Sequence, residues 1–174
     1  MISLLIFIAT AAIFYSYSQD SGQGSSMDDI VRDAKTTSGY FISSGYPKDW
    51  NSSRVIMIGL TNGDGRIAGS KLDSLNEIQY SAARSLLNTK YEFFLHFEDR
   101  KGCFVKIKSS GENYGFGHPE AGVVDAGSSG SCIMQDAKNM ALNLTDIGPE
   151  KVVKIERVVI LNSTIAKMVL HEWQ

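Results

Sequence analysis

The sequence has few of the residues that most often mark a chemical function. Its 174 residues include two cysteines, three histidines and three prolines, and its net charge is −2. This charge balance gives no basic surface for nucleic acid. The HExxH, nucleophile-elbow and phosphate-loop motifs are all missing from the chain. We therefore expect neither an enzyme nor a nucleic-acid-binding protein, and no cofactor.

Metal-binding patterns are missing as well. His96, His118 and His171 do not have the spacing of zinc ligands, so we expect each to lie on the surface or at a strand edge. The segment 62–65 (NGDG) resembles part of a calcium loop, but Lys71 stands where such a loop requires a bidentate glutamate. The sequence therefore predicts a tight turn at residues 62–65 and no metal site.

Basic residues are absent before Arg32, and the first segment of the chain is apolar instead. Between Ile2 and Phe14, the only polar side chains are Ser3 and Thr10, and none is charged. As a helix, residues 1–18 would span roughly 27 Å, which is short for crossing a bilayer. A cleaved signal peptide is one alternative, although it would have a basic start and a later small-residue cleavage site.

A helix that is apolar on every side has to be buried in lipid, in its own domain or in a bundle of identical helices. The Gly/Ser-rich neck over residues 19–26 would let this helix swing free, which argues against the alternative of an internal core helix. We interpret residues 1–18 as an assembly or anchor helix and residues 27–174 as one globular domain. The side chains expected to drive assembly are Ile2, Leu4, Leu5, Ile6, Phe7, Ile8, Ile13 and Phe14.

Two further features are typical of an exported domain. In such a chain Cys103 and Cys132 would form one disulfide, which stabilises by about 3–4 kcal/mol through loop closure; two buried free thiols are the alternative. N-x-S/T sequons begin at Asn51, Asn143 and Asn162, each in an expected turn or loop. Glycans on these asparagines would place the domain outside the cytoplasm.

Two amphipathic helices are expected in the domain. The first covers residues 27–44, begins after an N-cap at Ser26, and ends at Gly45 because Pro47 prevents its continuation. The second covers residues 70–88, where apolar side chains recur at three- and four-residue steps.

Strands account for most of the remaining residues. The expected strands are 54–60, 91–97, 103–108, 151–161 and 164–173, with turns at 62–65, 99–102 and 162–163. On the strand 91–97, alternation predicts that Phe94 and His96 face outward. Residues 109–131 are rich in Gly and Ser and are expected to form a long loop.

Together these features resemble type IV pilins, and more specifically archaeal pilin-like surface proteins. The resemblance is carried by the apolar start ISLLIFIATAAIFYSYS, by SSGYPKDW at residues 43–50, and by the closing hairpin RVVILNSTIAKMVLHEW. It implies an α+β fold, in which a protruding apolar N-terminal helix precedes a globular domain with an antiparallel sheet and two helices. In that family a peptidase removes a short charged leader, so we expect this chain to be the processed form or to start further upstream.

The resemblance also implies a function. It predicts a structural subunit of an extracellular type IV pilus-like filament, with adhesion to a surface or glycan as an added role. Such a subunit is held in the membrane before assembly and then associates with copies of itself. The alternatives are a single-pass, membrane-anchored surface glycoprotein that acts as a binding module, and a plain secreted domain.

Overall fold

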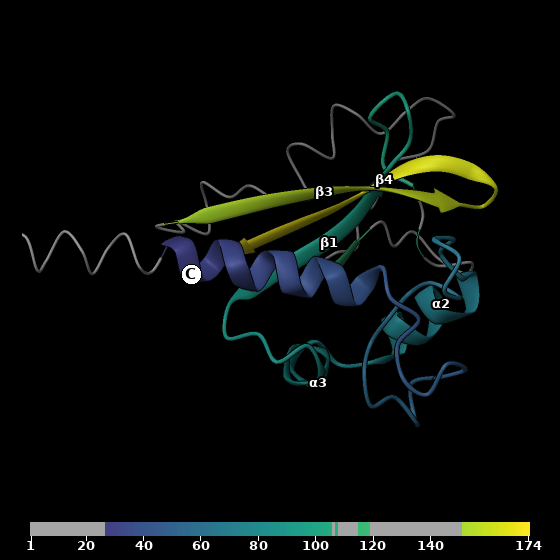
Figure 1. Cartoon of the computed structure of the whole chain (residues 1–174), viewed down its shortest axis with the longest axis horizontal. Coiled ribbons are helices and arrows are strands. Elements are labelled where there is room, and N and C mark those ends of the chain that lie inside the picture. The colour runs from purple at the N-terminus through teal and green to yellow at the C-terminus, as the bar shows by residue number, and fades with distance from the viewer. Residues whose placement is uncertain (1–26, 106, 108–114, 119–150) are drawn as a thin grey trace, which may run out of the picture.

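The computed structural model describes residues 27–105, 107, 115–118 and 151–174 (Figure 1). Within them the chain folds as an α+β domain, in which a helix over residues 27–41 lies against a four-stranded antiparallel sheet. The expected α+β class is therefore confirmed. The apolar segment 1–18 and the neck 19–26 lie outside the described residues. The other elements are α2 (Gly69–Glu77), α3 (Tyr80–Leu86), β1 (Glu92–Glu98), β2 (Gly115–Gly117), β3 (Val152–Leu161) and β4 (Thr164–Trp173).

The sheet has the strand order β2-β1-β4-β3, and every neighbouring pair is antiparallel. β3 and β4 form the closing hairpin that the sequence predicts. Asn162 and Ser163 make its two-residue turn with φ angles of 50° and 64°. Positive φ at both turn residues matches the twist of the flanking strands, which is why two-residue hairpins favour this geometry.

The partner expected for β1 was the segment 103–108, and the described residues confirm this only in part. Glu98 and Phe104 form an isolated antiparallel bridge, and the Val105 amide donates to the Phe97 carbonyl at 2.9 Å, but residues 103–105 do not form a strand. In the sheet β1 pairs with β2, which lies inside the region expected to be a loop. Gly117 is required in this pairing, because its φ is 146° and a Cβ built on it would lie 2.2 Å from the Phe93 carbonyl oxygen.

The expected strand 54–60 is also absent. Its backbone makes an isolated bridge from Met57 to Tyr46, and the Met57 carbonyl accepts a hydrogen bond from the Tyr46 amide at 2.9 Å. Gly59 lies so close to the end of the first helix that a Cβ on it would be 2.2 Å from the Gly45 nitrogen. The segment is therefore packed against residues 43–46 and does not enter the sheet. The turn at 62–65 is confirmed, with φ angles of 91° at Gly63 and 76° at Gly65.

The expected helix 70–88 is divided into α2 and α3. Ile78 and Gln79 both have extended backbones, with ψ angles of 131° and 141°. No proline or glycine marks this break. The break lets α3 turn toward the sheet, where the Tyr80 hydroxyl donates to Oε2 of Glu92 at 2.7 Å and accepts from the Phe93 amide.

The main core lies between the sheet and the helices. Phe41 from helix 27–41 contacts Phe93 of β1 with ring centroids 6.0 Å apart. The opposite face of β1 is buried too, since Phe94 is 2% exposed and His96 is 3% exposed. The prediction that these two side chains face solvent is therefore wrong, because both faces of β1 are covered.

Candidate functional site: the seat of helix 27–41 on the sheet

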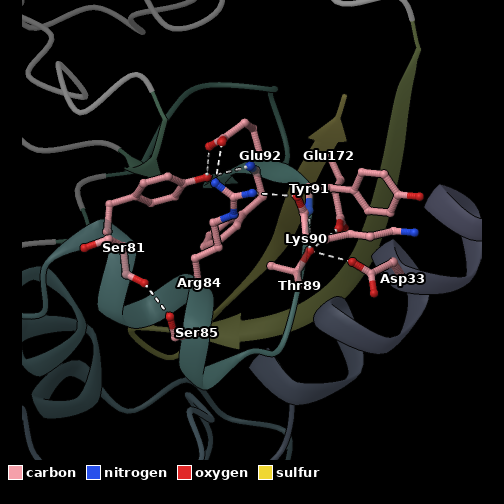
Figure 2. Close-up of polar contacts among 11 residues, drawn as sticks. Asp33, Ser81, Arg84, Ser85, Thr89, Lys90, Tyr91, Glu92 and Glu172 are labelled. Atoms are coloured by element: carbon pink, nitrogen blue, oxygen red, sulfur yellow. Dashed lines mark hydrogen bonds and ion pairs between the residues drawn. The ribbon is translucent and has the colours of Figure 1, made fainter.

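Polar contacts hold helix 27–41 to the sheet at two places in the described part of the chain. Nη2 of Arg157 on β3 donates to Oγ of Ser38 at 3.2 Å, and a second set of contacts meets at Thr89, in the connection between α3 and β1 (Figure 2). The Thr89 Oγ1 atom lies 2.5 Å from Oδ2 of Asp33 on the helix and 2.8 Å from Oε1 of Glu172 on β4. It also accepts a hydrogen bond from the Tyr91 amide at 3.1 Å. One hydroxyl group therefore joins the helix, the connecting segment and the centre of the sheet.

The number of hydrogen atoms available for hydrogen bonds in this cluster determines whether Glu172 is protonated. The Thr89 hydroxyl has one hydrogen, so it can donate to only one of the two carboxyl groups. The shorter contact goes to Asp33, and the contact to Glu172 is then a hydrogen bond only if Glu172 is the donor. A chain of donors results: protonated Glu172 donates to Thr89, and Thr89 donates to the Asp33 carboxylate.

Burial agrees with a neutral Glu172. Its side chain is fully buried, and its second oxygen, Oε2, has no hydrogen-bond partner in the described part of the chain. An ionised carboxylate in this position would lack the solvation that its charge requires. Burial, together with the adjoining Asp33, raises the pKa of Glu172 to about 8.

A second polar cluster holds α3 against the start of β1 (Figure 2). Glu92 contacts Nη1 of Arg84 at 2.5 Å and the Tyr80 hydroxyl at 2.7 Å, while Nη2 of Arg84 donates to the Lys90 carbonyl. Burial, with the neighbouring Glu92 carboxylate, raises the pKa of Tyr80, so the phenol remains a donor. This cluster positions the segment that carries Thr89.

Apolar contacts also hold helix 27–41 against the sheet. Ile30 and Ala34 are fully buried against Tyr91 and Val153, close to the first turn of the helix. Each such burial contributes roughly 1–3 kcal/mol. At the other end of the helix, Phe41 joins the main core. Helix 27–41 is thus fixed to the sheet along its whole length.

The opposite face of the sheet carries a pair of stacked histidines. The rings of His96 and His171 lie 5.5 Å apart and are inclined by 16°, and Phe104 stacks on His96 at 4.6 Å. Nε2 of His96 lies 3.2 Å from Oε1 of Glu98, while Nδ1 of both histidines is buried without a partner. The expectation that these histidines are surface residues is wrong for His96, which is buried in a central strand, whereas His171 is partly exposed. Within the described part of the chain, no group of side chains could hold a metal ion.

We predict that His171→Phe makes the protein less sensitive to acid. Burial, together with the neighbouring His96, lowers the pKa of His171 to about 4. Between pH 6.5 and 4 the unfolded chain therefore binds a proton that the native state does not, so the free energy of unfolding falls as the pH falls. The loss over this range is on the order of 3 kcal/mol.

Urea unfolding of the wild type and His171→Phe at pH 7 and pH 4.5 measures this effect. The phenyl ring keeps the stack and removes the buried, unpaired Nδ1 of His171. The unfolding free energy of the variant minus that of the wild type should be larger at pH 4.5 than at pH 7. An equal difference at both pH values would contradict the prediction.

The structure describes only some of the glycosylation, disulfide and assembly residues predicted from the sequence. Asn162 is confirmed at an exposed hairpin tip, and Asn51 lies in a turn where its Oδ1 accepts from the Ser53 hydroxyl at 2.9 Å. Cys103 is buried and disulfide-bonded, but its expected partner Cys132 lies outside the described residues, so the pairing stays a prediction. Also outside them are Asn143 and the expected assembly residues Ile2, Leu4, Leu5, Ile6, Phe7, Ile8, Ile13 and Phe14.

Sequence reasoning did not identify Asp33, Thr89 or Glu172. One signal was available, because Glu172 continues the inward alternation of Met168 and Leu170 along the last strand. A carboxyl group in an inward register needs a partner from a neighbouring element. The identity of that partner could come only from the tertiary structure.

No protein-family model, curated protein or solved structure matches the chain. Among the described residues, no helix is both long enough and apolar enough to cross a membrane.

Proposed function

We propose that this chain is a structural subunit of an extracellular type IV pilus-like filament, assembled through its apolar segment 1–18. The observation that supports the proposal is the direction in which helix 27–41 enters the domain. Its first buried side chain, Ile30, contacts Val153 at the end of the sheet where Val152 pairs with Trp173. Figure 1 likewise places the start of the helix and the C-terminus at the same end of the domain.

In this proposal the two ends of the sheet, at Val152 and at Asn162, have different roles. The Asn162 turn lies at the opposite end of the ten-residue strand β3, roughly 30 Å from the Val152 end. A segment that joins the helix at its start would therefore attach the domain by one end and leave the Asn162 sequon at the other. Because the Thr89 contacts hold helix 27–41 against the sheet, the position of such a segment would also set the position of the sheet.

The energy for assembly would come from the apolar segment. Its eight large apolar side chains each gain roughly 1.5–3 kcal/mol on burial, which is on the order of 12–24 kcal/mol before ordering costs. Repetition of one head-to-tail contact produces an open filament and not a closed ring. Lipid would bury the same side chains before assembly.

A single charge in the apolar segment tests this proposal. We expect Ile6→Asp or Phe7→Asp to abolish filaments, seen by negative-stain microscopy, in cells that still produce the domain. Val158→Asp is the matched control, because Val158 is an apolar side chain that is 78% exposed. Filaments that persist in Ile6→Asp would rule out assembly through this segment. Discrete particles of the wild type in detergent would favour the membrane-anchored binding module instead.

A further inference from the structure

A groove of about 690 Å³ opens beyond the C-terminal end of helix 27–41. It lies between the segment 48–51, Asn62 and the first turns of α2. The polar side chains on which the inference rests are Lys48, Asn51, Asn62, Ser70, Lys71 and Ser74.

Lys71 gives the groove a fixed positive charge. The residue is only 4% exposed, and its Nζ donates to the carbonyls of Ser44 at 2.6 Å and Thr61 at 2.7 Å. An ammonium group has three hydrogens, so one donor remains after these two bonds. In the described part of the chain no carboxylate forms an ion pair with Lys71, and a buried cation of this kind favours an anionic partner.

Lys48 adds a second, exposed cation. The positive charge of Lys48 contributes to the lowered pKa of Lys71, after burial, so the two ammonium groups sense each other across the groove. Asp49 is the carboxylate that also lines the groove, and it lies 3.6 Å from Nη2 of Arg54. The Asp49 charge acts on Lys71 in the opposite direction to that of Lys48, but the lining contains two lysines and one carboxylate, so the groove remains positive.

The start of α2 reinforces this field. No side chain caps the helix, and its first turn contains no acidic residue. Unpaired amides at a helix start attract negative charge. Ser70 and Ser74 lie on this part of α2, and their hydroxyls, with the amides of Asn51 and Asn62, can bond both donors and acceptors.

We propose that the groove binds an acidic sugar. The sugar carboxylate lies between Lys48 and Lys71 at the start of α2, and the sugar hydroxyls bond to the serine and asparagine side chains around it. The volume accommodates one or two sugar rings, within the range usual for small-ligand sites. This inference rests on the groove alone and does not require filament assembly.

Sodium glucuronate is the probe, and glucose is its neutral counterpart. The experiment uses the full chain in detergent micelles, produced without glycosylation so that Asn51 is free, and follows the amide NMR signals of Ser70 and Ser74. We expect glucuronate to shift these signals with a millimolar dissociation constant and glucose to bind at least tenfold more weakly. Lys48→Gln should weaken glucuronate binding at least fivefold, whereas Lys101→Gln, on an exposed turn, should leave it unchanged.

Ser70→Asp separates binding from folding. A carboxylate in the first turn of α2 stabilises the helix through its dipole, but it repels an anion in the groove. The variant should therefore keep or raise its melting temperature and lose glucuronate binding. The proposal is overturned if glucuronate leaves the groove signals unmoved, if Lys48→Gln binds as tightly as the wild type, or if only inorganic phosphate shifts these signals.

Discussion

Glu172→Gln should stabilise the protein at alkaline pH by on the order of 5 kcal/mol and have little effect near pH 4.5. The native pKa of about 8 lies above the ordinary value of 4.5. Between these values the native state holds a proton that the unfolded chain has lost. The free energy of unfolding therefore falls as the pH rises, by about 1.4 kcal/mol per unit, and levels off above pH 8.

The glutamine variant removes this dependence because its amide is neutral at every pH. Its Nε2 can donate to Thr89 Oγ1 as the protonated acid does, so the donor chain to Asp33 is kept. The lowered pKa of His171 and His96 acts below pH 6.5 with the opposite sign and is common to both proteins. It therefore cancels when the wild type and the variant are compared at the same pH.

Chemical denaturation at half-unit steps from pH 4.5 to 9 measures the difference. Glu92→Gln is the matched control, because it removes a carboxylate from the same region but breaks the pair with Arg84. That control should lose a modest amount of stability without removing the decline of stability with pH above 6.5. If Glu172→Gln declined with pH as steeply as the wild type does, a protonated Glu172 in the native state would be disproved.

Gly59→Ala should destabilise the domain by more than about 3 kcal/mol. A Cβ at this position would lie 2.2 Å from the Gly45 nitrogen and 2.7 Å from the Ser43 carbonyl oxygen. Both contacts are with backbone, so they cannot be relieved by rotating a side chain. The Gly59 carbonyl also accepts the 2.7 Å hydrogen bond from Trp50 Nε1, and a shift of this backbone would disturb the groove as well.

Gly39→Ala provides the contrast. Gly39 lies inside helix 27–41, and a Cβ built there meets no atom within 4 Å. Alanine should therefore raise stability by about 1 kcal/mol through its helix propensity. Thermal unfolding followed by circular dichroism should move the two midpoints in opposite directions. A small effect of Gly59→Ala would mean that residues 43–45 and 57–59 do not approach as closely as described.

The closing hairpin could be predicted from the sequence because local rules determine it. Alternating apolar residues flank Asn162 and Ser163, and a two-residue turn fixes the register of both strands. β2 could not be predicted in this way. With Gly115 and Gly117 on either side of Phe116, it has only one side chain and therefore no alternation.

The remaining differences arise from tertiary contacts. The Val- and Ile-rich segment 54–60 has the composition of a strand, yet its backbone partners are residues 41–46 and not the sheet. The extended break at Ile78 and Gln79 has no proline or glycine to signal it, because it is set by the burial of Ile78 and the contact of Tyr80 with β1. His96 follows the alternation correctly but faces a side of the sheet that is itself covered.

The position of β4 in the middle of the sheet also affects how the chain reaches its fold. Leu95 of β1 lies opposite Leu170, about 75 residues later, whereas the β3–β4 hairpin is local. A chain that is made or exported from its N-terminus presents β1 long before its partner exists. The edge of β1 that pairs with β4 then stays without its partner until Trp173 has emerged, so completion of the sheet depends on release of the last strand.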